Sequence, residues 1–233
     1  MTNSARIITA SLDDTFPLSR LPAELLAKSE NLHPARRQQW RAGRALLAEA
    51  LFAFSGQEML PEMQISARGK PSFTDPSLPH FSLSHSVNSL QLVLCAAGET
   101  GGDVEQIRPR ARYLDVARQA FSETEFCWLT EQENPLNAFW QLWCLREAWL
   151  KQQAGSVWQM ERIRLDPAAG QFSPESATDS KLWWAAGETV MSAMALPACV
   201  TTCEEYIFDA RNGSIIPQLI TRNPRRWSCY SLA

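Results

Sequence analysis

Three acidic residues stand in positions that suit the binding of a divalent cation. Asp103 and Glu105 flank Val104, and on an extended chain residues two apart point to the same side. Glu147 lies in a segment with helical periodicity, four residues before Lys151, so these two share one helical face. A few carboxylate ligands suit Mg²⁺, which completes its shell with water and substrate phosphates. The three acids therefore predict a magnesium site that acts on a phosphorylated substrate.

A second group of side chains is basic or polar and precedes the acids in the chain. Gly69-Lys70-Pro71 predicts a turn that displays its lysine outward, and His85 follows serines at the end of a short apolar run. Four arginines lie along one predicted helix: Arg36, Arg37, Arg41 and Arg44. Together these groups suit an anionic ligand with more than one phosphate.

Taken singly, each of these features has a plainer structural interpretation. A D-x-E pair is common on a solvated strand edge, and a Glu/Lys pair at this spacing is common on a helix surface. A lone histidine beside serines is most simply a structural residue, and the arginines are most simply a solvated helix face.

Hydrophobic periodicity predicts the elements that position these residues. Helices are predicted over 34–53, 113–120, 122–129 and 135–153. Ser122 and Glu125 predict a capping box at the start of the third. Short apolar runs predict strands at 81–83, 90–96, 206–208 and 214–220.

Composition narrows the class of protein. The 233 residues are 45% hydrophobic and 20% charged, which is typical of a soluble globular chain. A net charge of −3 does not favour a nucleic-acid partner.

We see no secretory signal and no membrane-spanning run, so we expect a cytoplasmic protein with reduced cysteines. Cys199 and Cys203 lack the further ligands that a zinc site needs.

The order of the motifs is more specific than any one of them. From the N-terminus they are Gly43-Arg44-Ala45-Leu46-Leu47, Gly69-Lys70-Pro71, Phe81-Ser82-Leu83-Ser84-His85-Ser86, Gly102-Asp103-Val104-Glu105 and Trp143-x-x-Arg146-Glu147-Ala148-x-x-Lys151. This series resembles the surfactin-type phosphopantetheinyl transferases, which show GKP, (N)xSHS, G-(I/V)-D-(I/V)-E and W-x-x-KE-(A/S)-x-x-K. The match spans about residues 36–158. The stretches EQIRPRAR and KQQAGSVWQ are similar to the AcpT-type subgroup.

The resemblance implies a fold and a reaction. The fold is α+β, a pseudo-dimer of two similar halves, each a helix packed on a small antiparallel sheet. We expect residues 1–100 to form the half on the nucleotide side of coenzyme A, and residues 101–233 the half with the metal ligands and the catalytic helix. Coenzyme A lies in the cleft between them. The implied reaction is the Mg²⁺-dependent transfer of 4′-phosphopantetheine from coenzyme A to a serine of an apo acyl or peptidyl carrier protein, with release of 3′,5′-ADP. A monomer is expected, since both halves come from one chain.

The resemblance also assigns roles to residues. Asp103, Glu105 and Glu147 are similar to the metal ligands, and Lys151 to the lysine that touches the pyrophosphate and steadies the departing 3′,5′-ADP. Glu147, or a water that it holds, takes the proton of the carrier serine. That role requires a raised pKa or a metal-bound water, because an ordinary carboxylate is a weak base for a hydroxyl.

Further residues are expected to bind coenzyme A. His85 resembles the residue that contacts the 3′-phosphate, with Ser84 beside it. Lys70 and Pro71 resemble the residues that border the adenine. The 3′-phosphate anchor is Arg44 together with Arg36 or Arg37. Arg68 is a further candidate.

Three positions depart from the family pattern. Arg146 replaces the usual lysine and changes the geometry of any contact made there. Gly101-Gly102 is expected to loosen the strand that presents Asp103. Ser82 replaces the common asparagine. The metal ligands, the histidine and the final lysine are all retained, so we expect an active enzyme.

A basic segment at 107–121 is the expected docking site for an acidic carrier protein. It contains four arginines and three apolar residues: Arg108, Arg110, Arg112, Arg118, Tyr113, Leu114 and Phe121. An ordinary solvated helix with surface arginines explains the same residues equally well.

Two other functional classes share parts of the pattern. A nucleotide-binding or phosphohydrolase enzyme would use the same acids for Mg²⁺, but the chain has no Walker G-x-x-x-x-G-K-[ST] motif and no general phosphatase signature. A non-catalytic carrier-protein partner would have lost part of the site, whereas all five of its expected groups are intact. Release of 3′,5′-ADP separates the transferase from both.

Overall fold

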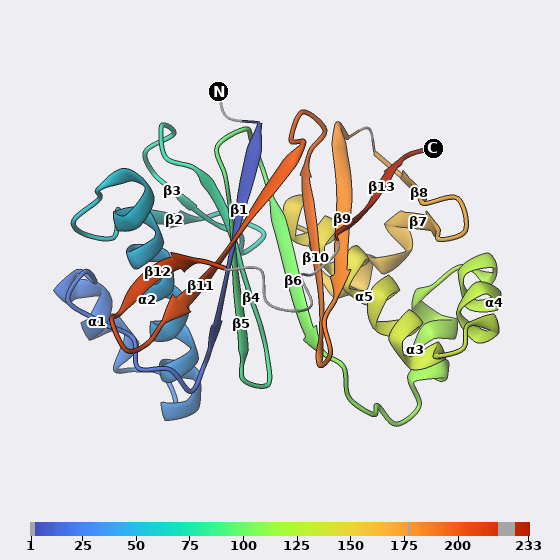
Figure 1. Ribbon diagram of the computed structural model, residues 1–233, viewed down its shortest axis with the longest axis horizontal. Helices are drawn as coiled ribbons and strands as arrows, with labels where there is room; N and C mark the ends of the chain where they lie inside the picture. Colours follow the sequence, from blue (N-terminus) through green and yellow to red (C-terminus); the bar gives the residue numbers. More distant parts are fainter. Residues whose placement is uncertain (1–2, 177, 219–226) are drawn as a thin grey trace.

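The computed structural model of the chain describes residues 3–176, 178–218 and 227–233. Two β-sheets stand side by side at its centre, with helices on either side (Figure 1). The helices are α1 Ala23–Ser29, α2 Pro34–Ser55, α3 Tyr113–Ala120, α4 Glu123–Glu131 and α5 Pro135–Gln152, with the 3₁₀ helix η1 Val157–Arg162. None of the helices in these residues is long and apolar enough to cross a bilayer.

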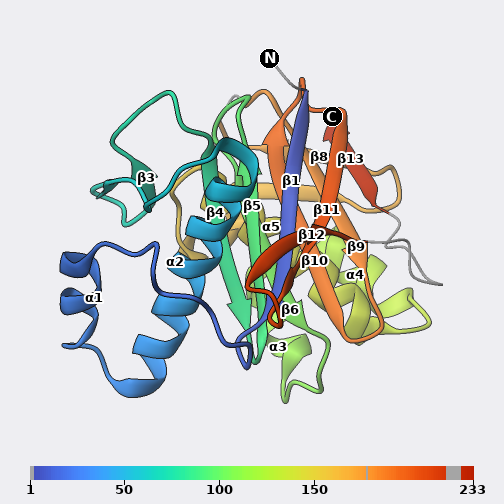
Figure 2. The same ribbon diagram turned by 60° about the vertical axis from the view of Figure 1, so that its left-hand side comes forward.

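The first sheet has the strand order β12-β11-β1-β5-β4. Its strands are β1 Ser4–Ser11, β4 His80–Ser86, β5 Ser89–Cys95, β11 Thr202–Asp209 and β12 Ser214–Pro217. Helix α2 covers one face of this sheet, with α1 beside it (Figure 2). Leu46, Leu47 and Leu51 of α2 are fully buried in one core with Leu92 of β5. Burial of this apolar stripe holds the helix against the sheet.

The second sheet has the order β6-β10-β9-β13-β8-β7. Its strands are β6 Gly101–Gln106, β7 Ile163–Asp166, β8 Gln171–Pro174, β9 Ser180–Ala186, β10 Val190–Pro197 and β13 Ser228–Leu232. Helix α5 packs on it through Phe139, Leu145 and Trp149, which share a core with Leu182 and Ala193 of the sheet. A two-stranded sheet of β2 Met63–Ile65 and β3 Pro71–Phe73 is paired separately from both, and its Phe73 packs on Phe81 of β4.

The predicted elements agree with the structure where the hydrophobic pattern is strong. The four predicted helices correspond to α2, α3, α4 and α5, and the Ser122–Glu125 capping box is present. The predicted strands at 81–83 and 206–208 fall within β4 and β11, whereas those at 90–96 and 214–220 overlap β5 and β12 but run past the ends of these strands at Cys95 and Pro217. Positions 219–220 of the last prediction lie outside the described residues. The mixed helix-and-sheet class is therefore confirmed.

Two features of the sheets differ from the expectation. The sheets are not purely antiparallel, because β1 pairs with β11 and β13 pairs with β8 in parallel. In addition, β11 and β12 follow residue 101 in the chain but belong to the first sheet. The division into residues 1–100 and 101–233 stays a prediction. After β10, which belongs to the second sheet, the chain returns to the first sheet to form β11 and β12.

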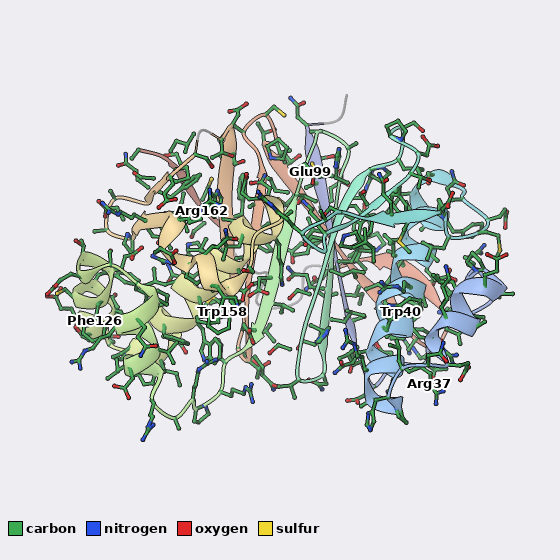
Figure 3. The ribbon with its side chains drawn as sticks, turned by 180° about the vertical axis from the view of Figure 1, so that it is seen from behind. Arg37, Trp40, Glu99, Phe126, Trp158 and Arg162 are labelled. Atoms are coloured by element: carbon green, nitrogen blue, oxygen red, sulfur yellow. The ribbon has the colours of Figure 1, made fainter. Side chains whose placement is uncertain are left out.

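The two sheets meet at their end strands, β4 and β6. Each strand has a backbone partner on one side only, β5 and β10 respectively. Seen from behind, the face that carries both strands is flanked by α5 on one side and by α2, with Trp40, on the other (Figure 3). A site between the strands is therefore bordered by both long helices.

The glycine pair at the start of β6 is tightly packed. A Cβ on Gly101 would lie 1.9 Å from the Ala148 carbonyl oxygen of α5, and one on Gly102 would lie 2.6 Å from a Val93 methyl. Both positions are buried. The expectation that these glycines loosen the strand is wrong, because their missing side chains let α5 and β5 approach the strand closely.

Substituting Gly101→Ala is therefore expected to destabilise the protein. The added methyl group meets backbone atoms of α5, and overpacking of this kind costs about 1–3 kcal/mol or more. Gly43→Ala in α2 is the matched control, because its Cβ would make an ordinary 3.5 Å contact with Leu83 and alanine favours a helix by about 0.5–1 kcal/mol. Urea denaturation of both variants measures this difference. Equal midpoints for Gly101→Ala and the wild type would contradict the packing argument.

Candidate active site

Asp103 and Lys151 form the centre of the candidate site. The Lys151 ammonium donates hydrogen bonds to Asp103 Oδ1 at 2.6 Å and to Ser84 Oγ at 2.9 Å. The Ser84 hydroxyl donates to the same Asp103 oxygen at 2.8 Å. Asp103 is only 3% exposed, and its second oxygen, Oδ2, has no hydrogen-bond partner in the described part of the chain. A buried, unpartnered carboxylate oxygen calls for a cation or a donor from outside the chain.

The two remaining acids lie in the same electrostatic environment. Burial raises the pKa of Glu105, and the neighbouring Asp103 adds to the rise, against a 2.5 Å hydrogen bond from Ser86 and the charge of Lys151. Burial, followed by repulsion from Asp103, raises the pKa of Glu147 to about 7, although Lys151 opposes this shift. Negative charge is therefore crowded among these three side chains.

Lys151 balances part of this charge. Burial disfavours its ammonium, but Asp103 and Glu147 outweigh that effect and raise the pKa of Lys151. The lysine therefore stays protonated at neutral pH.

The three acids could supply some of the ligands of a Mg²⁺ ion but not all of them. No three His, Cys, Asp or Glu side chains among the described residues are close enough to hold a metal ion by themselves. However, Asp103 offers a free oxygen, and the charges of Glu105 and Glu147 add to the negative field around it. Mg²⁺ takes few protein ligands and fills its shell with water and phosphate oxygens. The donor set therefore fits an ion whose other ligands come from a substrate.

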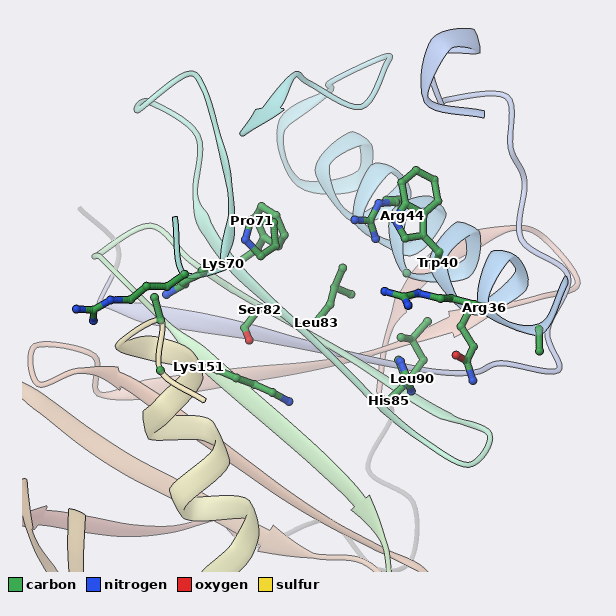
Figure 4. A pocket seen from close by; sticks show the side chains of 18 of the residues that line it. Arg36, Trp40, Arg44, Lys70, Pro71, Ser82, Leu83, His85, Leu90 and Lys151 are labelled. Carbon is green, nitrogen blue, oxygen red and sulfur yellow. The ribbon is translucent and has the colours of Figure 1, made fainter. Parts of the chain in front are cut away.

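A cavity of about 780 Å³ opens beside these acids. It lies between α2, β4, the turn before β3 and the end of α5, and Lys151 points into it (Figure 4). Its basic and aromatic lining comes mainly from α2 and the turn: Arg36, Trp40, Arg44, Arg68, Lys70, Pro71, His85 and Lys151. Asp103, Glu105 and Glu147 do not line the cavity themselves, and the cavity reaches the acid site through Lys151.

The arginines of α2 divide into two groups. Arg44 stacks over the Trp40 ring at 3.9 Å, and its buried Nε has no partner among the described residues. Desolvation lowers the pKa of Arg44 to about 10. Arg36 also lines the cavity, whereas Arg37 and Arg41 both pair with Glu30. Arg36 and Arg37 were the two alternatives for the residue that binds the 3′-phosphate together with Arg44. Of these two, Arg36 is the one that lines the cavity.

Alternation along β4 separates two neighbouring residues of the SHS motif. His85 lines the cavity, and loss of water together with repulsion from Lys151 lowers its pKa, against the pull of Asp103. Ser84, predicted as a coenzyme A contact, is not among the lining residues. Its hydroxyl instead faces Asp103 and Lys151, because successive strand residues point to opposite sides.

Lys70 differs from the expectation of an outward-facing lysine. Its ammonium donates to the Thr100 carbonyl at 3.1 Å and to the Gln152 carbonyl at 2.9 Å, and it pairs with Glu99. Gln152 is the last residue of α5, where helix carbonyls lack intrahelical donors. Lys70 therefore borders the cavity but holds the end of α5, and Pro71 remains beside it at the cavity wall.

Comparison with known proteins agrees with this arrangement. The model of the 4′-phosphopantetheinyl transferase superfamily matches residues 99–187. The 4′-phosphopantetheinyl transferase AcpT of Salmonella typhi is 38% identical over 151 residues, which cover 64% of this chain and 74% of that protein. AcpT of Escherichia coli K12 is 41% identical over 131 residues, covering 55% and 64%. The 4′-phosphopantetheinyl transferase HetI of Nostoc sp. is 30% identical over 169 residues, covering 66% and 70%.

The chain belongs to the 4′-phosphopantetheinyl transferase superfamily. The family and enzyme class predicted from the motif order are thereby confirmed, including the likeness to AcpT. The matched range contains the three acids and Lys151, but not the cavity-lining residues of α2.

Arg146 has a structural role in this transferase. It is 1% exposed and pairs with the equally buried Glu125 of α4. It also donates to the Met160 and Ile163 carbonyls, both at 3.3 Å. The side chain therefore points away from the cavity and ties α4 and η1 to α5.

Segment 107–121 is only partly available for docking. Phe121 is buried, Tyr113 packs on Phe139, and Arg110 lies 5.2 Å from the centre of the Trp143 ring. Arg108, Arg112, Leu114 and Arg118 are exposed. The exposed part is therefore more basic and less apolar than the sequence suggested.

Two polar residues near the site were given no role from the sequence. Ser86 contacts Glu105, as described above. Gln91 is fully buried on β5 and donates to the Asp103 carbonyl at 3.1 Å and to the Ala193 carbonyl at 3.5 Å. An available signal was the glutamine itself, which interrupts the otherwise apolar run Leu90–Cys95.

Proposed function

We propose that this enzyme transfers 4′-phosphopantetheine from coenzyme A to a serine of an apo acyl or peptidyl carrier protein, releases 3′,5′-ADP and uses Mg²⁺ as its cofactor. The observation that carries the proposal is the continuity of a basic, aromatic-lined cavity with a buried cluster of acids through Lys151. A nucleotide with several phosphates matches the first region, and its reacting pyrophosphate matches the second.

Coenzyme A carries phosphates and an adenine ring that complement the side chains lining the cavity. Arg36, Arg44 and Arg68 offer cationic donors for its phosphates, and the unpartnered Nε of Arg44 is available for one of them. Trp40 and Pro71 offer apolar surface for the adenine. His85 lines the same cavity as Lys151, within the electrostatic reach of Lys151 and Asp103, and it can donate one hydrogen bond to a phosphate oxygen.

Asp103, Glu105 and Glu147 are the residues that would hold Mg²⁺. When bound, the ion neutralises charge on the phosphoryl oxygens as the bond to the leaving group breaks. The Lys151 ammonium contributes a fixed positive charge at the same place. This charge favours a phosphate oxygen and the departing 3′,5′-ADP.

Glu147 is the proposed proton acceptor. Its pKa of about 7 is close to the value that suits a general base at neutral pH. The serine proton passes to the Glu147 carboxylate as the serine oxygen bonds to the phosphorus that carries pantetheine. The bond from that phosphorus to the bridging oxygen breaks, and the oxygen leaves with 3′,5′-ADP.

We further propose a pseudo-dimer of two halves that acts as a monomer in the cytoplasm. Each sheet carries one long helix, α2 or α5, and the site draws residues from both. A single chain therefore supplies the complete site.

The carrier protein is proposed to dock on the exposed part of segment 107–121. Arg108, Arg112 and Arg118 present positive charge, with Leu114 as an apolar contact. An acidic carrier surface complements this charge.

The proposed reaction is tested first by the intact mass of an apo acyl carrier protein incubated with this enzyme, coenzyme A and Mg²⁺. We expect a gain of one phosphopantetheine with release of 3′,5′-ADP, and loss of both with EDTA or in Asp103→Ala, because the metal site is then removed. Hydrolysis of coenzyme A without a gain in carrier mass would support a phosphohydrolase instead. Binding of coenzyme A with no turnover on any of several carriers would support a non-catalytic protein.

Arg44→Ala is expected to weaken coenzyme A binding by about tenfold to a hundredfold, the range for loss of a hydrogen bond to a charged group. Arg37→Ala is the matched control, because Arg37 comes from the same helix but pairs with Glu30. Isothermal titration calorimetry gives both dissociation constants. A larger effect at Arg37 would contradict the assignment of the cavity.

The double variant Arg112→Glu, Arg118→Glu is expected to raise the carrier KM several-fold at low salt and to leave the KM for coenzyme A unchanged. Both side chains are exposed and neither lines the cavity, and rim charges act mainly on association. Steady-state kinetics at two salt concentrations measure the effect. Unchanged carrier kinetics at low salt would refute docking on this segment.

A further inference from the structure

The two faces of β4 serve different parts of the enzyme. Phe81, Leu83 and His85 line the cavity, and Ser82 also borders it. Ser82, Ser84 and Ser86 alternate with the first three along the strand, and each is 7% exposed. The strand therefore presents a row of hydroxyls, of which Ser84 and Ser86 do not line the cavity.

These hydroxyls accept hydrogen bonds from three backbone amides of β6. Gly102 N donates to Ser82 Oγ at 2.9 Å, Val104 N to Ser84 Oγ at 3.3 Å, and Gln106 N to Ser86 Oγ at 3.2 Å. Each serine is twenty positions before its partner, so β4 and β6 run parallel in a fixed register. We call this row of contacts the serine ladder. It joins the end strands of the two sheets.

A serine hydroxyl does two things here that a backbone carbonyl does not. Its oxygen accepts an amide proton, and its own proton is free for another acceptor. Ser84 donates that proton to Asp103, and Ser86 donates it to Glu105 at 2.5 Å. The serine ladder thus satisfies buried amides on the open edge of β6 and orients two carboxylates at the same time.

Gln91 fixes the same strand from a second direction. Its amide group donates to the main-chain carbonyl of Asp103 and to that of Ala193 on the neighbouring strand β10. The backbone of Asp103 is therefore held by β5, while its side chain is held by β4. Little freedom remains for the acid to turn.

We propose that Ser86 is a positioning residue of the transferase, which orients Glu105 and, with Ser82 and Ser84, keeps the acid-bearing strand in register with the nucleotide-binding sheet. The inference rests on the proposed function and deepens it. Ser86 does not line the cavity, so its hydroxyl acts on the acid site and not on nucleotide binding.

Three variants test this proposal. Ser86→Ala removes the hydroxyl, and Ser86→Thr keeps it on a residue that favours strands. Ser89→Ala is the matched control, because Ser89 lies directly opposite Ser86 on β5 and has no contact with β6 among the side-chain hydrogen bonds of the described residues. Ser86→Ala is expected to lower kcat about tenfold or more, the effect of a lost hydrogen bond to a charged group. Its KM for coenzyme A should stay within twofold, and Ser86→Thr should recover most of kcat.

A fall in kcat that Ser86→Thr does not recover, together with a urea midpoint below that of Ser89→Ala, would indicate general damage to the fold and overturn the proposal. Equal kcat values for Ser86→Ala and Ser89→Ala would also overturn it.

Two measurements keep the proposal testable if the proposed reaction is itself wrong. Hydrogen–deuterium exchange reports on the amides of β6, and calorimetry in EDTA reports on the binding of 3′,5′-ADP. Faster exchange across 102–106 in Ser86→Ala, with unchanged 3′,5′-ADP affinity, would support the positioning role. Exchange equal to that of Ser89→Ala would overturn it. Failure of the proposed function would instead appear as a wild-type protein that modifies no carrier.

Discussion

The burial of like charge at the seam between two sheets is the constraint on which the rest of the structure depends. Asp103 is almost completely buried, and Glu105 and Glu147 lie within its field. Carboxylates in such a place are unfavourable unless donors and a cation surround them. Lys151 of α5 provides a cation, and the serine hydroxyls of β4 donate hydrogen bonds to the carboxylates. The helix and the strand must therefore approach β6 closely from two sides.

The close approach of α5 and β4 to β6 explains the identity of several residues around these elements. Gly101 lets α5 approach so that Lys151 reaches Asp103. Lys70 binds the last carbonyl of the same helix and fixes its end beside the cavity. Arg146 secures the opposite side of α5 through Glu125. The ammonium of Lys151 is thus placed by contacts that its neighbours along α5 make with the rest of the protein.

The sequence predicted the features that depend on local pattern. The stripe from Phe139 to Leu150 and the capping box at Ser122 are each encoded within a short continuous stretch of sequence, and both elements are present. It also indicated which residues gather at the site, because the motif order is a property of the family. The roles of Ser84 and Lys70 could not be read in the same way. Their contacts, Asp103 for one and the Gln152 carbonyl for the other, depend on how strands and helices meet. The pattern around Val190–Pro197 was equally uninformative, because a strand buried on both faces shows no alternation.

The return of β11 to the first sheet has a consequence for how this chain can be divided. Strand β1 pairs with β5 on one side and with β11 on the other. A fragment that ended near residue 100 would keep α2 but would leave β1 as an open edge with the apolar Ile7 and Ile8. Open apolar edges promote aggregation. Residues 1–100 and 101–233 therefore cannot be produced as independent modules by one cut, because β11 and β12 complete the first sheet and its folding depends on both parts of the sequence.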